Sequence, residues 1–213
     1  MEYAFHIYNK LAADGTTMAT DKLLRADIRN KFIKTKGAGL RSQLENKHFD
    51  EDDQPPVDVC IGIDLAIGDS LGPITGSMLK YKTQGLNLFL YGTLAAPVTA
   101  KEIRYMRTFL KETHPHSQVI AVDAAVGNEG DIGLIKISDT PLLPGAGANK
   151  KLGAIGDLSV MGIVAEKSIA NYGLLNTTRL NLVYTMSEII SDGLAAMLWE
   201  RCARQKANAA KNA

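Results

Sequence analysis

The sequence has few of the features that mark secreted, membrane-spanning or nucleic-acid-binding proteins. It contains two cysteines in 213 residues, Cys60 and Cys202, too few for a disulfide framework, and we expect both to be small buried hydrophobes in a reducing compartment. Its 24 Lys and Arg residues nearly balance 23 Asp and Glu residues, so a broad basic face for nucleic acid is not indicated. No apolar run approaches the roughly 20 residues that span a bilayer, and the N-terminus lacks the apolar core of a secretory signal. We therefore expect a soluble cytoplasmic protein that binds neither membrane nor nucleic acid directly.

Differences in composition divide the chain into three segments. Residues 1–56 form a charged N-terminal extension, with one helical pattern that begins near Thr20 and an acidic, proline-containing end, FDEDDQPP. Residues 57–203 alternate β-branched apolar runs with helical patterns, which predicts a single α/β domain. Residues 204–213 are a polar tail that we expect to fray.

The order of the apolar runs predicts a three-layer α/β/α sandwich around a mostly parallel, mixed sheet of about five strands. The first three strands are separated by helical patterns, as parallel strands require. Only about nine residues separate the third strand from the fourth, whereas a parallel return needs a dozen or more, so we expect the fourth strand to run antiparallel. The expected strands are 57–64, 86–94, 118–126, 133–138 and 157–166.

Three aspartates lie where predicted strands end. Asp64 and Asp69 follow the first strand, and Asp123 lies near the end of the third. Ligands of open α/β sheets bind beyond the carboxyl ends of parallel strands, and neighbouring strands would bring Asp69 and Asp123 together there. Two close carboxyl groups tend to share one proton, so one can act as a general base on water while the other donates a proton.

The same aspartates have other uses. Clustered carboxylates can bind a divalent metal ion. Asp69 can instead cap the helix that follows it, and Asp64 can hold its turn by bonding backbone amides. The spacing of the residues leaves these alternatives open.

Several motifs, in order, resemble the YyaC-type family of sporulation proteases. They are IGIDLAIGDSLGP, LYGTLAAPVTA, VIAVDAAVG and ISDTPLLPGAGANKKLGAIGDLSVMGIV, with the helix start NTTRLNLV, and the resemblance covers roughly residues 57–195. That family is more distantly similar to the germination protease of endospore-forming bacteria and to the hydrogenase maturation endopeptidases. The resemblance implies a phosphorylase/hydrolase-like α/β/α fold in which one strand is antiparallel.

The resemblance also implies an activity. The segments DSLGP and VIAVDA match those that carry the two aspartates of the germination protease, an atypical aspartic protease, which makes Asp69 and Asp123 the implied catalytic pair. The implied substrate is a small protein or peptide, with small acid-soluble spore proteins as candidates, and the implied location is the developing spore. The hydrogenase maturation enzymes hold nickel with two acids and a later histidine, but none of the four histidines here follows Asp123, so we expect no metal and no cofactor.

Further residues are candidates for binding substrate. The loop PGAGANKK resembles a glycine loop of the germination protease, and its backbone amides can polarise a carbonyl or grip an extended chain, or the loop can be a plain turn. Asp157 is a weaker candidate, because the predicted strand direction places it at the opposite edge of the sheet from Asp69. The candidate substrate-binding residues are Asp64, Gly145, Gly147 and Asn149.

Two other functions remain open at this stage. The chain can be a non-enzymatic protein that holds a peptide or partner on a protease-like fold, or a metal-dependent hydrolase that uses Asp64, Asp69 and Asp123 as ligands. We expect residues 1–50 to dock a helix that stabilises the fold or mediates self-association, with masking of the site as the alternative. The sequence leaves a homo-oligomer open.

Overall fold

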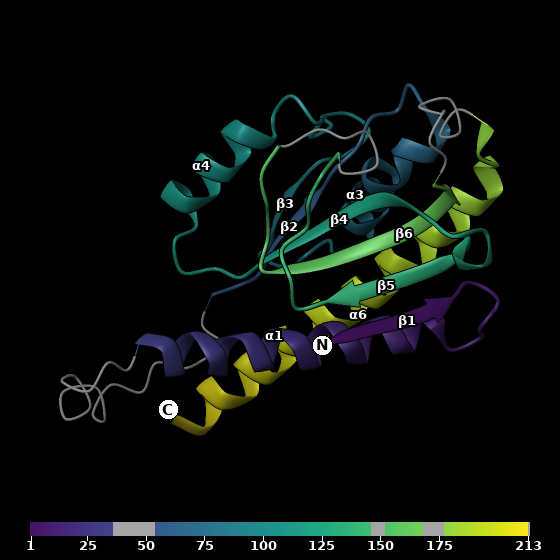
Figure 1. Ribbon diagram of the computed structural model, residues 1–213. Coiled ribbons are helices and arrows are strands. Elements are labelled where there is room, and N and C mark those ends of the chain that lie inside the picture. Colours follow the sequence, from purple (N-terminus) through teal and green to yellow (C-terminus); the bar gives the residue numbers. More distant parts are fainter. Residues whose placement is uncertain (36–53, 146–151, 168–176, 213) are drawn as a thin grey trace.

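A mixed six-stranded sheet lies at the centre of the protein, with helices on both of its faces (Figure 1). The computed structural model describes residues 1–35, 54–145, 152–167 and 177–212. The strand order is β1-β5-β6-β4-β2-β3, and within this described sheet β5 alone runs opposite to the other five strands. The predicted antiparallel strand is therefore confirmed. The strands are β1 (Glu2–His6), β2 (Val57–Cys60), β3 (Phe89–Tyr91), β4 (Val119–Gly127), β5 (Leu134–Ser138) and β6 (Leu158–Glu166).

The helices divide unequally between the two faces, which confirms the predicted three-layer sandwich. Residues of α1, α3 and α6 form one large core with β4, β5 and β6. On the other face, α4 packs on Val57 and Val59 of β2 and on the start of β4, in a smaller core. The helices are α1 (Ala12–Thr35), α3 (Leu71–Lys82), α4 (Ile103–Thr113) and α6 (Leu180–Asn212), with short 3-10 turns η1 (Ile67–Ser70) and η2 (Glu129–Asp131).

The N-terminal residues take part in the sheet, which their composition did not predict. Strand β1 pairs along its whole length with β5, and α1 packs against α6 and β1. The predicted start of this helix near Thr20 is wrong, because α1 already begins at Ala12. Its first turn contains Gly15, where a side chain would meet the ring of Phe5, so glycine lets β1 and α1 pack closely.

The C-terminal helix continues through the residues predicted to be a polar tail. Helix α6 reaches Asn212, and Arg204 within it lies 2.7 Å from a carboxylate oxygen of Asp21 in α1. No helix in the described ranges combines the length and the apolar character that crossing a membrane requires.

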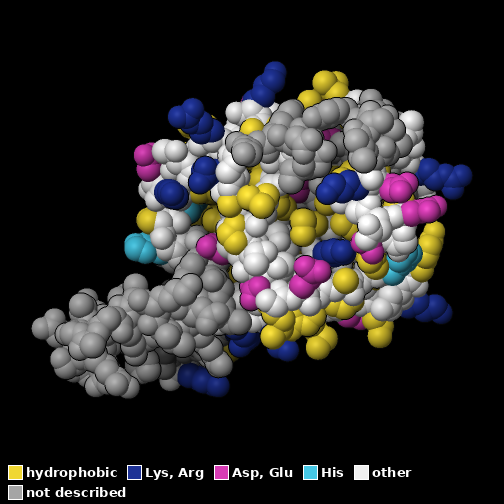
Figure 2. Space-filling view, in the orientation of Figure 1, with side chains coloured by type: hydrophobic (Ala, Val, Ile, Leu, Met, Phe, Trp, Pro, Cys, Tyr) yellow, Lys and Arg dark blue, Asp and Glu magenta, His cyan; other side chains and the backbone are white. Residues whose placement is uncertain are grey.

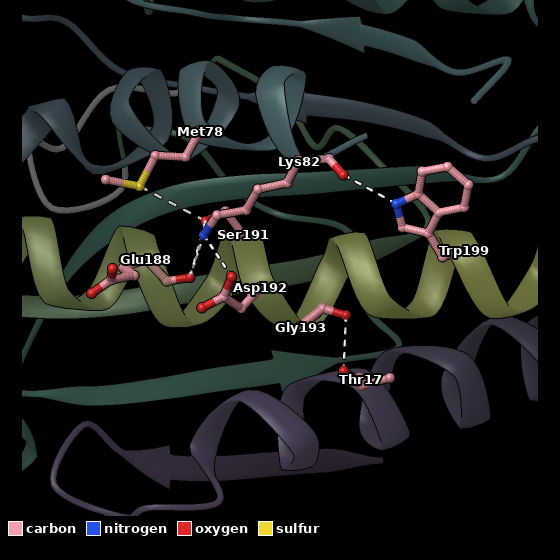
Figure 3. Close-up of polar contacts among 8 residues, drawn as sticks. All are labelled: Thr17, Met78, Lys82, Glu188, Ser191, Asp192, Gly193 and Trp199. Atoms are coloured by element: carbon pink, nitrogen blue, oxygen red, sulfur yellow. Dashed lines mark hydrogen bonds and ion pairs between the residues drawn. The ribbon is translucent and has the colours of Figure 1, made fainter. Parts of the chain in front are cut away.

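Polar contacts fix the end of α3 against α6 (Figure 3). The Lys82 ammonium lies 2.6 Å from an Asp192 carboxylate oxygen and donates a hydrogen bond of 2.7 Å to the Ser191 hydroxyl. The indole N–H of Trp199 donates to the Lys82 carbonyl at 3.0 Å. This carbonyl belongs to the last turn of α3, where helix carbonyls lack partners within the helix, so Trp199 caps α3 from a neighbouring helix.

Replacing Trp199 by phenylalanine should lower the free energy of unfolding by about 1 kcal/mol. The substitution keeps an aromatic ring in place and removes the hydrogen bond to Lys82, and one such bond contributes about that much. Urea denaturation followed by circular dichroism measures the change. Tyr184→Phe, at a half-exposed tyrosine of the same helix, is the control and should leave the stability unchanged. Equal stability of Trp199→Phe and the wild type would contradict the capping role.

Candidate active site

A tight turn after β2 delivers Asp69 to the carboxyl edge of the sheet. The chain leaves β2 at Cys60, and Gly62 adopts a backbone φ of 144°. A side chain at Gly62 would lie 2.0 Å from the Asp69 carbonyl oxygen, which itself accepts a 3.0 Å hydrogen bond from the Ile63 N–H. Only glycine fits this approach, so the turn fixes where η1 and Asp69 lie. Helix α3 then begins at Leu71 with Ser70 at its N-cap position, so Asp69 is not the N-cap residue of α3.

Asp123 lies in β4, just beyond the point where β2 stops. Its neighbour Val122 pairs with Cys60, the last residue of β2, and Asp123 itself is buried. The Ala124 N–H donates a 2.8 Å hydrogen bond to an Asp123 carboxylate oxygen. Burial raises the pKa of Asp123 well above its ordinary value, the negative charge of Asp69 raises it further, and the hydrogen bond from Ala124 lowers it. The two aspartates are thus close enough to influence each other's ionisation.

The other described candidate residues lie in the turn after β2, in the loop after β5 and at the opposite end of the strands. Asp64 is exposed in the turn after β2. Gly145 has a φ of 72°, in the left-handed region, while Gly147 and Asn149 lie outside the described residues. Asp157 lies at the opposite edge, where its carboxylate accepts a 2.8 Å hydrogen bond from the Val119 N–H and ties the starts of β4 and β6 together.

One buried carboxyl group was not singled out by the sequence. Asp58 lies in the middle of β2, between Leu90 of β3 and Ile120 of β4, and is fully buried. Among the described residues, neither of its carboxylate oxygens has a hydrogen-bond partner. Burial raises the pKa of Asp58 to about 8, and raises that of the neighbouring Cys60 thiol well above its ordinary value. The signal that could have revealed Asp58 is an aspartate inside the otherwise apolar run VDVC.

Among the residues that the structure describes, neither a cluster of metal ligands nor a histidine lies at the aspartate pair. In the described part of the chain, no three His, Cys, Asp or Glu side chains cluster in a way that could hold a metal ion. His114 is half-buried: its ring nitrogen Nε2 lies 2.7 Å from the Tyr91 hydroxyl, and its ring packs on Phe89 and Phe109. It follows α4, at the end of the sheet away from Asp69.

Comparison with known proteins matches the chain to a family, over a region that includes the aspartate pair. A family model described as "Protein of unknown function (DUF1256)" matches residues 30–193. The chain belongs to this family. It is also 42% identical, over 142 residues, to a Bacillus subtilis (strain 168) protein named "Uncharacterized protein YyaC", a match that covers 67% of this chain and 69% of that protein. The DUF1256 region includes Asp69, Asp123 and Asp58, whereas β1 and the first three quarters of α1 precede it.

Proposed function

We propose that the protein is an endopeptidase of sporulation in which Asp69 and Asp123 activate water. The observation that carries this proposal is the electrostatic coupling of the pair: Asp123 is buried, and the charge of Asp69 adds to the rise in its pKa. A carboxyl group that keeps its proton beside a more accessible carboxylate is the arrangement that acid–base hydrolysis needs. The sporulation setting rests on the resemblance of the segments DSLGP and VIAVDA to those of the germination protease.

The two aspartates have different tasks in this proposal. Asp69, half-buried, is the base that takes a proton from water as the water oxygen bonds to the peptide carbonyl carbon. Asp123, whose pKa is raised by burial, donates its proton to the carbonyl oxygen of the substrate. The proton held by Asp69 then passes to the leaving amine. As the C–N bond breaks, the hydroxyl formed on the former carbonyl oxygen returns its proton to Asp123, and the pair again holds one proton.

A groove beside the sheet suits an extended polypeptide substrate. It has a volume of about 620 Å³ and follows the outer side of β3 from Leu88 to Val98. The carbonyl of Val98 accepts a 3.0 Å hydrogen bond from Gly62, the glycine of the turn that positions Asp69. Apolar side chains such as Leu88, Val98 and Met106 line this groove together with polar ones such as Lys80, Thr83 and Gln84, a mixture that can contact both the side chains and the backbone of a peptide. We propose that a small protein, such as a small acid-soluble spore protein, enters the site along it.

The test is mass spectrometry of a small acid-soluble spore protein incubated with the wild type, with Asp69→Asn and with Asp123→Asn. Each variant should cut at least about a hundredfold more slowly, because each loses a proton-transfer group. Glu112→Gln, at an exposed carboxylate of α4, is the control and should retain most activity. Because the pKa of Asp123 is raised, activity should fall as the pH rises through that value and Asp123 loses its proton.

Other outcomes would redirect the assignment. Full cleavage by both Asp69→Asn and Asp123→Asn would rule out the dyad. Cleavage that disappears with chelator would assign the same carboxylates to a metal-dependent hydrolase. An intact spore protein that nevertheless binds the chain would favour a binding protein.

A further inference from the structure

We infer that two copies of this chain associate through the free edge of β1 and form one continuous sheet across a two-fold axis. This inference goes beyond the proposed function and concerns a different part of the molecule, because β5 and β6 separate β1 from β4. Among the described residues, β1 pairs with β5 alone, so its other edge has no strand beside it. Edge strands of this kind are ready to pair with another chain unless they are protected.

The backbone groups that β1 presents at this edge can be identified. The Met1 carbonyl accepts from the Asp139 N–H, and the Ile7 N–H donates to the Gly133 carbonyl. In an antiparallel ladder, alternate residues point their N–H and C=O groups toward the same neighbour, so the odd-numbered residues of β1 face β5. Glu2 and Ala4 therefore direct both backbone groups away from β5, toward the open edge. His6 directs its N–H there, while its carbonyl already accepts a 2.8 Å hydrogen bond from the Asn9 N–H.

The side chains of β1 complement a second copy of themselves. In the antiparallel register that overlaps all five residues, Ala4 lies opposite Ala4 of the second copy, and the two exchange a pair of hydrogen bonds. In the same register, Glu2 of each copy lies opposite His6 of the other, so an acid faces a base twice. On the other face, Tyr3 lies opposite Phe5, an aromatic pair of the kind that stabilises antiparallel strands.

Exposed apolar side chains surround this edge. Figure 2 shows hydrophobic side chains along the lower rim of the molecule, where Figure 1 places β1 and α1. The exposed fractions of the side chains are 85% for Tyr8, 64% for Leu11 and 73% for Met18. Leu11, just before α1, and Met18 are seven residues apart and therefore lie on the same side of the helix. Helix α1 itself covers the face of β1 that carries Tyr3 and Phe5. A two-fold axis at Ala4 brings the two α1 helices near each other and buries these side chains.

Self-association fits this surface better than another partner does. A two-fold interface uses the same patch on both copies and must be self-complementary. The Glu2–His6 and Tyr3–Phe5 pairings meet that requirement without any further assumption. The short apolar centre of β1 also lacks the lysine or proline with which monomeric proteins protect a free edge.

Sedimentation velocity over about 1 to 100 micromolar chain tests the inference, because interfaces of ordinary size give dissociation constants in or below that range. The wild type should sediment as a dimer. Ala4→Pro removes the outward N–H at the centre of the interface while the ladder to β5 keeps its bonds, and it should weaken association at least about tenfold. Ala4→Val keeps that N–H at the same position and should remain dimeric.

A charge exchange tests the register and does not depend on proline. His6→Glu places two acids opposite each other in both halves of the interface and should weaken the dimer, and adding Glu2→Lys should restore it. Circular dichroism checks that each variant is folded. A monomeric wild type over the whole concentration range would overturn the inference. So would an Ala4→Pro variant that is folded and dimerises as the wild type does, or a failure of Glu2→Lys to rescue His6→Glu. Cleavage of spore protein is measured separately, so neither result depends on the other.

Discussion

Replacing Asp58 by asparagine should raise the free energy of unfolding by about 4 kcal/mol near pH 7 and change it little near pH 4. The reason is the buried position of Asp58 in β2, where burial raises its pKa from 3.8 to about 8. The folded protein therefore keeps a proton that the unfolded chain releases. The contribution of this proton to the free energy of unfolding is complete below the pKa that Asp58 has in the unfolded chain. It is lost as the pH rises toward 8, by about 1.4 kcal/mol for each pH unit. Asparagine has nearly the same shape and does not titrate.

Urea denaturation of the wild type and Asp58→Asn at several pH values between about 4 and 8 measures this effect. The difference in the free energy of unfolding between Asp58→Asn and the wild type should widen as the pH rises. Ionisation of Asp123 affects both proteins equally and does not change this difference. Asp58→Val is a second variant, and it should be more stable than the wild type even near pH 4. It also removes two buried oxygens that have no hydrogen-bond partner in the described part of the chain. A constant difference across the pH range would show that Asp58 does not take up a proton on folding.

The strands at the centre of the sheet could be predicted because their sequences are distinctive and their order obeys general rules. The apolar runs that form β2, β4 and β6 are unlike their surroundings, and the short connection before β5 dictated its direction. Strand β1 had no such signal. Its apolar centre is only three residues long, Tyr3 to Phe5, and its partner β5 begins 128 residues after it ends. Only tertiary pairing makes this segment a strand.

The candidate site could be predicted in part. Parallel strands end at one edge of a sheet, so Asp69 and Asp123 could be placed near each other from strand order alone. The burial of Asp123 and the raised pKa that follows from it depend on the surrounding layers, and the sequence does not give these. The burial of Asp58 was missed for the same reason, since an aspartate in an apolar run more often marks the end or the exposed side of a strand.

Replacing Gly72 by alanine should lower the free energy of unfolding by about 3 kcal/mol or more, which links the fold to the candidate site. Gly72 lies in the first turn of α3, and a Cβ atom there would lie 2.0 Å from the Ile61 carbonyl oxygen. Alanine stabilises a helix relative to glycine by only about 1 kcal/mol. That gain cannot offset the clash, because the Ile61 carbonyl is backbone and cannot move aside as a side chain can. Helix α3 must move away from β2 instead.

That movement should also be detectable at the aspartate pair. Asp69 precedes Gly72 by three residues, so a displaced α3 carries Asp69 away from Asp123, and the pKa of Asp123 should fall as the nearby charge recedes. Urea denaturation gives the change in stability, and carboxyl carbon NMR gives the pKa of Asp123. Gly130→Ala is the matched control, because no atom lies within 4 Å of its added Cβ, and it should change stability by less than about 0.5 kcal/mol. If Gly72→Ala lowered stability but left the pKa of Asp123 unchanged, the close packing of α3 on β2 would matter for folding and not for the pair. A change in both would show that the glycine contacts that hold α3 against the sheet also hold Asp69 beside Asp123.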